Sequence, residues 1–122
     1  MRKYLMIASA IITVASPQFA QAQAGKPPVS FATCGVCHKI KAGEKSTLGP
    51  NLFKVAGRRA GTLPGYSYSP AMQKSGIVWS RASLTDFLKS PSRKVPGTKM
   101  GFAGHTDPRK TDEIVTYLLG LK

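Results

Sequence analysis

The sequence predicts an all-α fold of three to five short helices that are joined by long loops. Three observations support this class. Helix-start signals recur along the chain, the alternation of apolar and polar residues typical of strands is weak, and Gly and Pro interrupt the chain at short intervals. Among the 122 residues, those from 25 onward show no internal repeat and no second-domain boundary. We therefore expect one domain over residues 25–122.

Residues 1–24 have the layout of a cleaved signal peptide. Two basic residues come early, residues 5–15 form an uncharged and mostly apolar run, and small residues then alternate with glutamine. Cleavage is expected after Ala22 or Ala24. A membrane anchor is the alternative, but a spanning helix needs about 20 apolar residues, and Pro17 breaks this run. The segment is also not amphipathic and Arg-rich like a mitochondrial transit peptide, so we expect export to the periplasm.

Four segments of the domain carry helix signals. Residues 29–36 can form a brief helix after two prolines. Three later helices begin with a cap residue, which proline follows in two cases, and each is stopped by Gly or Pro. Their expected limits are Ser69-Pro70 to Gly76, Ser80 to Pro91, and Asp107-Pro108 to Gly120. The last two have apolar faces, formed by Leu84, Phe87 and Leu88, and by Ile114, Val115, Leu118 and Leu119.

These short helices cannot supply a sufficient core by themselves. Residues 40–65 are rich in Gly and Pro and are expected to form loops, whose backbone groups must also be satisfied. A domain of about a hundred residues with so little apolar surface is marginal. We therefore expect a large apolar group to fill the middle of the fold.

The segment TCGVCHKI contains the only two cysteines, Cys34 and Cys37, followed directly by His38. A thioredoxin-like dithiol would need a βαβ unit around the two cysteines, and the sequence shows no strand signals for one. A zinc site would need a second pair of ligands, and a disulfide this short would contribute little stability. The remaining interpretation is haem attachment, in which both thiols form thioethers and His38 is the proximal iron ligand.

The second axial ligand has three candidates, Met72, Met100 and His105. Met100 lies in a loop rich in Gly and Pro, off any helical face, which is a poor place for a core-filling methionine. His/Met ligation would raise the reduction potential, whereas His105 would give a bis-histidine site of lower potential. The residues alone leave both Met100 and His105 open, with Met100 preferred.

Four segments, of which the haem motif is one, together make the comparison with a known family more specific than that motif alone. They are CGVCH at 34–38, GPNLF at 49–53, GRRAGTLPGYSYSPAM with GIVWS behind it at 57–80, and PGTKMGFAG at 96–104. With the DEIVTYLLGLK tail, their order and spacing resemble the class I cytochromes c of the mitochondrial type, including bacterial periplasmic relatives. The resemblance covers almost the whole domain. It implies a small cytochrome c fold around one covalent haem c, and a monomeric, soluble electron carrier that is not an enzyme.

The resemblance also implies roles for individual residues. Met100 corresponds to the axial methionine, and Pro50 to a proline whose carbonyl accepts a hydrogen bond from the His38 ring. The other implied haem contacts are the propionate donors Tyr68 and Trp79, the balancing cation Arg58, the polar Thr98 on the methionine side, and the aromatic Phe102 beside the haem edge. Two positions depart from the family pattern, since Met72 stands where Asn is frequent and Phe87 where Tyr is frequent.

The charge of the chain indicates acidic partners. It has 18 Lys plus Arg and 5 Asp plus Glu, and the domain without the first two basic residues keeps a net charge of +11. We expect docking to acidic faces of membrane redox complexes or soluble dehydrogenases, and not to nucleic acid. The lysines usual around the haem edge are few, because Thr33, Ser92 and Thr106 occupy such positions. The rival hypotheses are a haem protein with an open sixth site, and a thiol-disulfide oxidoreductase using Cys34 and Cys37.

Overall fold

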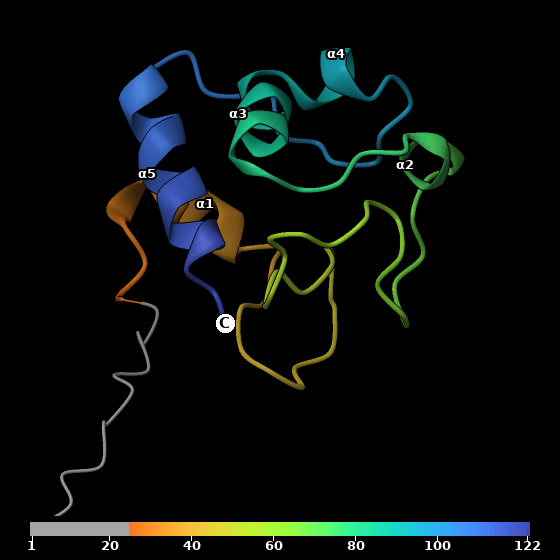
Figure 1. Cartoon of the computed structure of the whole chain (residues 1–122), viewed down its shortest axis with the longest axis horizontal. Helices are drawn as coiled ribbons and strands as arrows, with labels where there is room; N and C mark the ends of the chain where they lie inside the picture. Colours follow the sequence, from red (N-terminus) through yellow and green to blue (C-terminus); the bar gives the residue numbers. More distant parts are fainter. Residues whose placement is uncertain (1–24) are drawn as a thin grey trace, which may run out of the picture.

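The computed structural model describes residues 25–122, and the expected signal peptide lies outside the described residues. Within this range the chain forms five short α-helices and one 3-10 turn, which confirms the all-α class (Figure 1). In chain order the elements are η1 (Val29–Phe31), α1 (Ala32–Gly35), α2 (Pro70–Lys74), α3 (Arg81–Lys89), α4 (Pro91–Lys94) and α5 (Pro108–Leu119). None of these helices is long and apolar enough to cross a membrane.

Three of the helices start where their cap residues predicted. The Ser69 hydroxyl accepts the Met72 amide at the start of α2, and the Asp107 carboxylate accepts the Arg109 amide at the start of α5. Ser80 forms a reciprocal capping box with Ser83 at the start of α3. Such caps satisfy amides that have no partner inside the helix, so the start of each helix is determined locally.

Two details differ from the prediction. The expected helix over residues 29–36 is divided into the 3-10 turn η1 and the single turn α1. Pro91 follows the end of α3 as expected, but it also begins the unpredicted helix α4. The extended backbone of Ser90 separates the two helices, and proline fits the first turn of a new helix because it lacks the amide that would be unpaired there.

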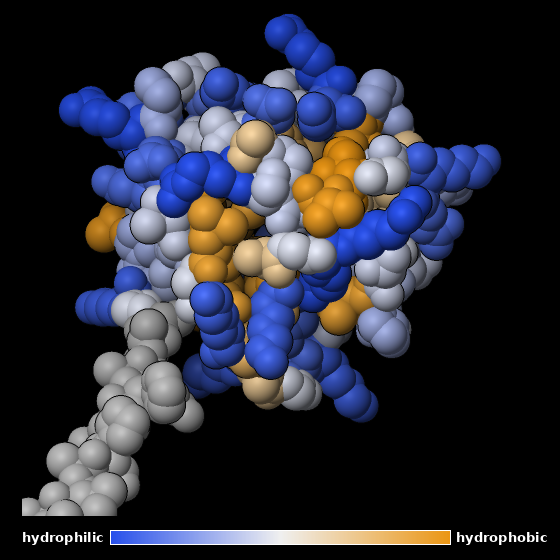
Figure 2. Space-filling view, viewed as in Figure 1, coloured by the Kyte–Doolittle hydropathy of each residue, from blue (hydrophilic) through white to orange (hydrophobic). Residues whose placement is uncertain are grey.

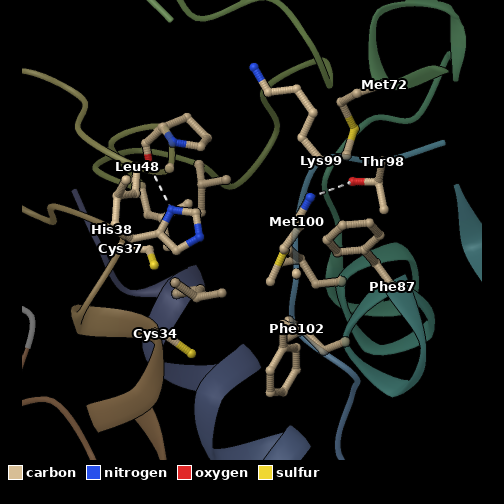
Figure 3. Close-up of a pocket in the computed structure, with 18 of the residues that line it drawn as sticks. Cys34, Cys37, His38, Leu48, Met72, Phe87, Thr98, Lys99, Met100 and Phe102 are labelled. Carbon is tan, nitrogen blue, oxygen red and sulfur yellow. Dashed lines mark hydrogen bonds between the residues drawn. The ribbon is translucent and has the colours of Figure 1, made fainter. Parts of the chain in front are cut away.

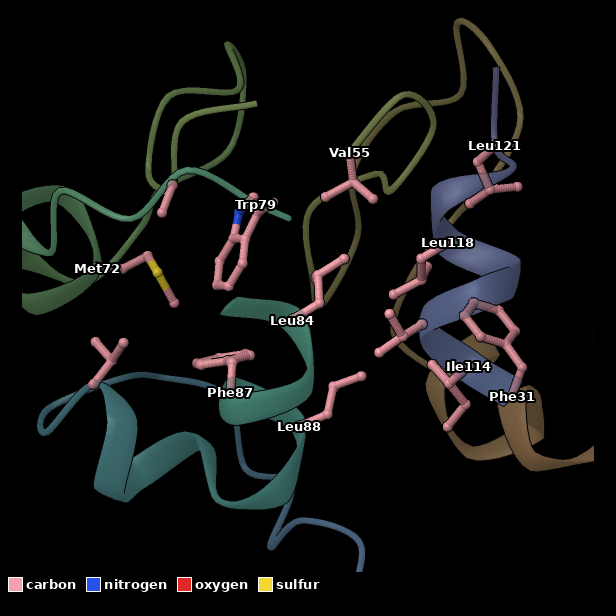
Figure 4. Close-up of a cluster of buried hydrophobic side chains, with 13 residues drawn as sticks. Phe31, Val55, Met72, Trp79, Leu84, Phe87, Leu88, Ile114, Leu118 and Leu121 are labelled. Atoms are coloured by element: carbon pink, nitrogen blue, oxygen red, sulfur yellow. The ribbon is translucent and has the colours of Figure 1, made fainter. Parts of the chain in front are cut away.

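The core gathers around α5, which lies beside η1 and α1 and packs against α3 (Figures 1 and 4). Ile114 and Leu118 of α5 are 1% and 3% exposed, and they point towards the apolar side of α3. Phe31 of η1 packs edge-to-face against Tyr117, with 5.1 Å between the ring centroids. The apolar faces predicted for the two longest helices are therefore buried, although Leu119 is only partly covered.

The long loop region between α1 and α2 is tied down by backbone hydrogen bonds. The Gly57 amide donates to the Trp79 carbonyl at 2.7 Å, and the Trp79 amide donates to the Arg58 carbonyl at 3.0 Å. Gly61 has a φ of +76°, and a Cβ atom there would lie 2.7 Å from the Cα atom of Gln73. This loop region therefore packs closely against the C-terminal part of α2 and the chain before α3.

Candidate functional site

A large cavity lies in the middle of the domain, between the segment around α1 and the loop that leads to α5 (Figure 3). Its volume is about 660 Å³ and its lining is mostly apolar, as is usual for cofactor sites. All ten site residues singled out from the sequence line it: Cys34, Cys37, His38, Pro50, Arg58, Tyr68, Trp79, Thr98, Met100 and Phe102. The large apolar space expected from the small core is thus present.

One wall of the cavity carries Cys34, Cys37 and His38. The amides of Cys37 and His38 both donate to the carbonyl of Cys34, at 3.1 Å and 2.9 Å. This single turn of chain places the two sulfur atoms and the imidazole on the same wall, as Figure 3 shows. The Cys-x-x-Cys-His spacing is what allows one turn to present all three groups.

The orientation of the His38 ring is set by the two residues that follow Leu48. The ring Nδ1 atom lies 2.7 Å from the Pro50 carbonyl oxygen, which accepts its hydrogen bond. A Cβ atom on Gly49 would lie 2.5 Å from Cε1 and 2.7 Å from Nδ1 of the ring, so only glycine fits against it. Because Nδ1 is engaged with the carbonyl, Nε2 is left as the nitrogen that can bind a metal.

The surroundings of this wall favour a metal ligand over a reactive thiol. Burial lowers the pKa of His38, and the Arg58 charge acts in the same direction, although the hydrogen bond to Pro50 opposes them. The neutral imidazole is the form that coordinates metals. Burial is also the main reason why the pKa of the Cys34 thiol is raised. A redox-active cysteine would need the opposite shift, so the burial of Cys34 does not favour the dithiol hypothesis.

The opposite wall is formed by the loop between α4 and α5. Its Met100 side chain points into the cavity and faces His38 across the gap (Figure 3). The Met100 amide donates to the Thr98 hydroxyl at 3.3 Å, which fixes the loop locally. Phe87 of α3 and Phe102 lie on the same side. An imidazole and a thioether therefore lie on opposite walls of one apolar cavity.

His105, the other candidate for the second ligand, does not line this cavity. Its ring packs edge-on against Phe102, with 5.0 Å between the ring centroids. Its amide donates to the Leu88 carbonyl at 3.0 Å, which ties the residue to the end of α3. The described structure thus places Met100, and not His105, opposite His38.

Known proteins are similar to this chain in sequence and in fold. No protein-family model matches it. It is 42% identical over 97 residues to cytochrome c2 of Agrobacterium tumefaciens (strain II Chrys), covering 77% of this chain and 87% of that protein. It is 37% identical over 118 residues to cytochrome c2 of Blastochloris viridis, covering 97% and 92%. The structure of cytochrome cH from Methylobacterium extorquens is similar with a TM-score of 0.69 and 47% identity, covering 73% of this chain and 89% of that one.

The chain belongs to the class I cytochrome c family. Its members are electron-transfer proteins and not enzymes, so this cytochrome c is an electron carrier. Its single Cys-x-x-Cys-His motif implies one covalently attached haem c. The residues of the cavity fit that group, because two thiols and an imidazole lie on one wall, a thioether lies on the other, and the lining between them is apolar.

One corner of the cavity in this cytochrome c is polar and suits a buried carboxylate. The Arg58 guanidinium donates to the Asn51 carbonyl at 2.9 Å and lies close enough to Tyr68 to affect its pKa, and Trp79 also lines the cavity. Burial lowers the pKa of Arg58 and raises the pKa of Tyr68. A buried anion requires a cation and hydrogen-bond donors around it, which are the groups these residues provide.

The two departures from the family pattern make the methionine side of the cavity more apolar. Met72 is 8% exposed and Phe87 is 6% exposed, and both line the cavity. Neither side chain brings an amide or a hydroxyl to the space next to Met100. Met72 and Phe87 therefore line the cavity with apolar side chains at the two positions where the resemblance implied polar ones.

Three contributors to the site were not predicted from the sequence. Gly49 contacts the His38 ring, and the GPN sequence was a signal that could have indicated a tight turn there. The Tyr66 hydroxyl donates to the Leu48 carbonyl at 3.0 Å. The Lys99 ammonium donates to the Ser67 carbonyl and lies 5.3 Å from the centroid of the Tyr66 ring. No local sequence pattern predicts the contacts of Tyr66 and Lys99.

Proposed function

We propose that this cytochrome c is a periplasmic carrier of single electrons whose haem iron is ligated by His38 and Met100. It would serve respiratory or photosynthetic redox partners. The observation that carries the proposal is the placement of the two side chains on opposite walls of one apolar cavity (Figure 3). When bound, the haem supplies an iron that alternates between the ferric and ferrous states.

The residues around the cavity suit a carrier because they hold both ligands in place and exclude water. The Pro50 carbonyl orients the His38 ring, and a carbonyl partner of this kind also increases the basicity of the imidazole. Met72 and Phe87 cover the methionine side with buried apolar side chains. A thioether ligand favours ferrous iron and raises the reduction potential. With His38 and Met100 both bound to it, the iron would have no place left to bind a substrate.

The surface of the domain supports transient docking to acidic partners. Figure 2 shows apolar side chains near the centre of one face, with hydrophilic side chains around them. Val36 and Leu48 line the cavity and are each 74% exposed, so apolar groups reach the surface at its mouth. A basic domain with a small apolar contact can be steered to an acidic face and still dissociate quickly. We infer that acidic faces of membrane redox complexes or soluble dehydrogenases are its partners, and that it acts as a monomer.

The periplasmic location is supported by the sequence of residues 1–24. Their basic start, short apolar run and small residues are typical of an export signal. Export to an oxidising compartment is also compatible with a domain whose two cysteines are both used to attach haem. Mass spectrometry of the protein isolated from a periplasmic extract would test both the location and the cleavage position.

Absorption spectroscopy of the haem-loaded protein tests the proposed ligation. We expect a low-spin ferrous spectrum and, in the ferric form, a weak far-red band from methionine sulfur. Met100→Ala should lose this band and let the ferrous protein bind carbon monoxide readily, whereas His105→Gln should leave the band in place. A low-spin wild-type protein that lacks this band would contradict the assignment and favour His105 as the second ligand. A high-spin wild-type protein would instead support the rival hypothesis of an open sixth site.

A further inference from the structure

We propose that the mouth of the cavity docks through an uncharged apolar contact, while a separate basic loop attracts the acidic groups of the partner. The mouth is the exposed part of the cavity lining and consists of Thr33, Val36, Leu48, Lys99, Gly101 and Ala103. The basic loop comprises residues 39–54 and carries the exposed Lys39, Lys41, Lys45 and Lys54. The inference rests on the proposed carrier function and specifies its partner: a redox protein whose contact face has an apolar centre, with carboxylates to one side of it.

The apolar part of the mouth is formed by Val36 and Leu48, which are each 74% exposed. Both flank Cys37. The Gly49 amide and the Thr47 hydroxyl, which belong to the two neighbours of Leu48, donate to the Cys37 carbonyl at 2.9 Å and 3.0 Å. The backbones of Val36 and Leu48 therefore lie close together on the histidine side of the opening.

The mouth offers a partner almost no charge. Lys99 is the one charged residue among its six members, and its ammonium already donates to the Ser67 carbonyl. The remaining members are threonine, glycine and alanine besides the two large apolar residues. The centres of protein interfaces are depleted in charged residues, whereas their rims are polar. The composition of the mouth is therefore that of an interface centre.

The basic loop lies outside the mouth, and none of its four lysines lines the cavity. The Leu52 amide donates to the Lys39 carbonyl at 2.8 Å, and the Asn51 side chain donates to the Lys41 carbonyl at 2.8 Å. These bonds fold the loop so that its two ends lie side by side. Figure 2 shows hydrophilic side chains over the end of the molecule that this loop and the C-terminus form in Figure 1.

The charge of the basic loop is hardly compensated. Glu44 is the one acidic residue among residues 39–54, and within residues 25–122 none of the four lysines forms a salt bridge. The other four acidic residues lie on α3, on α5 or at its N-cap, and three of them pair with an Arg or a Lys. The loop thus keeps a net positive charge that can attract carboxylates from a distance.

The separation of the two surfaces divides the work of docking. Lys39 directly follows His38, so the basic loop adjoins the wall of the histidine, beside the mouth. Charge attraction can bring a partner to this side and orient it, because it acts over several ångströms. Exposed ion pairs contribute little once contact is made, so the apolar mouth supplies the close contact. A partner therefore needs its carboxylates beside the contact and not around it.

Voltammetry of the haem-loaded protein on coated gold electrodes tests the two surfaces separately. One coating is a carboxylate-terminated alkanethiol monolayer, and the other is a mixed methyl- and hydroxyl-terminated monolayer. Each haem takes up one electron from the gold and returns it. We expect faster electron transfer on the methyl/hydroxyl monolayer, because carboxylates bind the basic loop and turn the mouth aside. Salt that shortens the Debye length from about 30 Å to about 8 Å should release the protein from the carboxylate monolayer only.

Substitutions in the mouth should exchange these preferences. Leu48→Lys should weaken binding to the methyl/hydroxyl monolayer by about tenfold, as the loss of a buried leucine contact implies. The same variant should transfer electrons faster than wild type on the carboxylate monolayer, because the mouth now carries a charge. Val36→Lys should act in the same way and provides an independent test. The far-red band in solution shows whether each variant keeps the site intact.

A matched pair of double variants tests the basic loop. Lys39→Gln/Lys54→Gln should weaken binding to the carboxylate monolayer by about tenfold or more, because each lysine near an anionic surface contributes about fivefold. Lys74→Gln/Lys110→Gln removes the same charge from exposed lysines of α2 and α5. This control should weaken binding by about twofold or less, since its lysines lie outside the loop. Equal losses in the two double variants would refute the role of the loop.

The wild-type voltammogram separates failure of this inference from failure of the carrier function. A protein without a reversible one-electron wave on either monolayer would remove the carrier function, and the docking inference with it. A reversible wave that is faster on the carboxylate monolayer, and that Leu48→Lys and Val36→Lys leave unchanged, would overturn the inference alone. The expected surface preference, reversed by both mouth variants, would establish it.

Discussion

The Nδ1 atom of His38 lies 2.7 Å from the carbonyl oxygen of Pro50, so the proposed iron ligand is oriented by a main-chain group 12 residues away. Gly49, the residue before Pro50, lies directly against the same ring. One short turn thus supplies both the hydrogen-bond acceptor and the close packing. Several consequences of this arrangement, and of the core around it, can be measured.

Substitution of Gly49 should disturb the His38 ring. In Gly49→Ala the new Cβ atom would lie 2.5 Å from the ring, which forces the imidazole or the turn to move. We expect the free energy of unfolding of the haem-loaded protein to fall by about 1–3 kcal/mol, as is typical of overpacking. Guanidinium unfolding would measure it. Gly35→Ala is the control, because its Cβ atom would meet nothing closer than 3.9 Å; equal stability of the two variants would contradict the argument.

Asn51 should be one of the most sensitive residues in the loops. Its side chain is buried, donates to the carbonyls of Lys41 and Glu44 at 2.8 Å each, and accepts the Phe53 amide at 2.8 Å. Asn51→Ala leaves these part-buried groups without their partners and should cost about 1–3 kcal/mol of unfolding free energy. Gln73→Ala, which removes an exposed amide, should change it by less than about 0.5 kcal/mol. A small effect of Asn51→Ala in urea unfolding would show that water replaces the side chain.

The contact of α5 with the rest of the core should dominate stability. Ile114 is 1% exposed, so Ile114→Ala should lower the free energy of unfolding by about 2–5 kcal/mol through lost burial and the cavity left behind. Val29 is 92% exposed, and Val29→Ala should cost less than about 0.5 kcal/mol. Thermal or denaturant unfolding of the haem-loaded protein gives both values. A loss below about 1 kcal/mol at Ile114 would mean that the neighbouring side chains collapse into the space.

Removal of the haem should unfold much of the domain. The cavity of about 660 Å³ lies among the core side chains, and without the group these side chains lose their contacts on that side. A Cys34→Ser/Cys37→Ser double variant, purified free of haem, should show much less helical circular dichroism than the haem-loaded chain. Native-like ellipticity with a cooperative melting transition would contradict this expectation.

Electron transfer with charged reagents should depend on ionic strength. Residues 25–122 carry a net charge of +11, so oxidation of the ferrous protein by the anion ferricyanide should slow as salt is added. The expected decrease is about tenfold or more as the Debye length falls from about 30 Å to about 8 Å. Stopped-flow absorption would follow the reaction. A cationic cobalt complex is the control and should react faster with added salt; the same trend for both oxidants would exclude steering by charge.

The starts of α2, α3 and α5 could be predicted because caps act locally. Ser69, Ser80 and Asp107 each satisfy an amide two or three residues further along, so their effect is visible in a short stretch of sequence. Helix α4 was missed because proline is a signal both for the end of one helix and for the first turn of another. Which meaning applies depends on the backbone of Ser90, which the sequence alone does not specify.

The sequence predicted the residues of one wall of the site more completely than those of the other wall. The Cys-x-x-Cys-His motif is compact, so its residues indicate their chemistry directly. On the opposite wall the residues alone favoured Met100 but left His105 open, and Thr98 and Phe102 could be named only through the resemblance to a family. The bonds of Tyr66 to Leu48 and of Lys99 to Ser67 join residues 18 and 32 positions apart, without periodicity or motif. Contacts of this kind follow from tertiary packing, which local patterns do not encode.

The two walls of the cavity also differ in when they can be completed. The wall with Cys34, His38 and Pro50 comes from a short, early stretch of the domain, whereas Met100 comes from its last quarter. When the N-terminal part of the chain appears first, it presents the attachment motif before the residues of the opposite wall are available. The cavity is then open on one side, and a flat group can reach the two thiols without any part of the fold having to be displaced. Closure by the later segment would convert an accessible attachment point into an enclosed one, so the order of the sequence itself separates loading from burial.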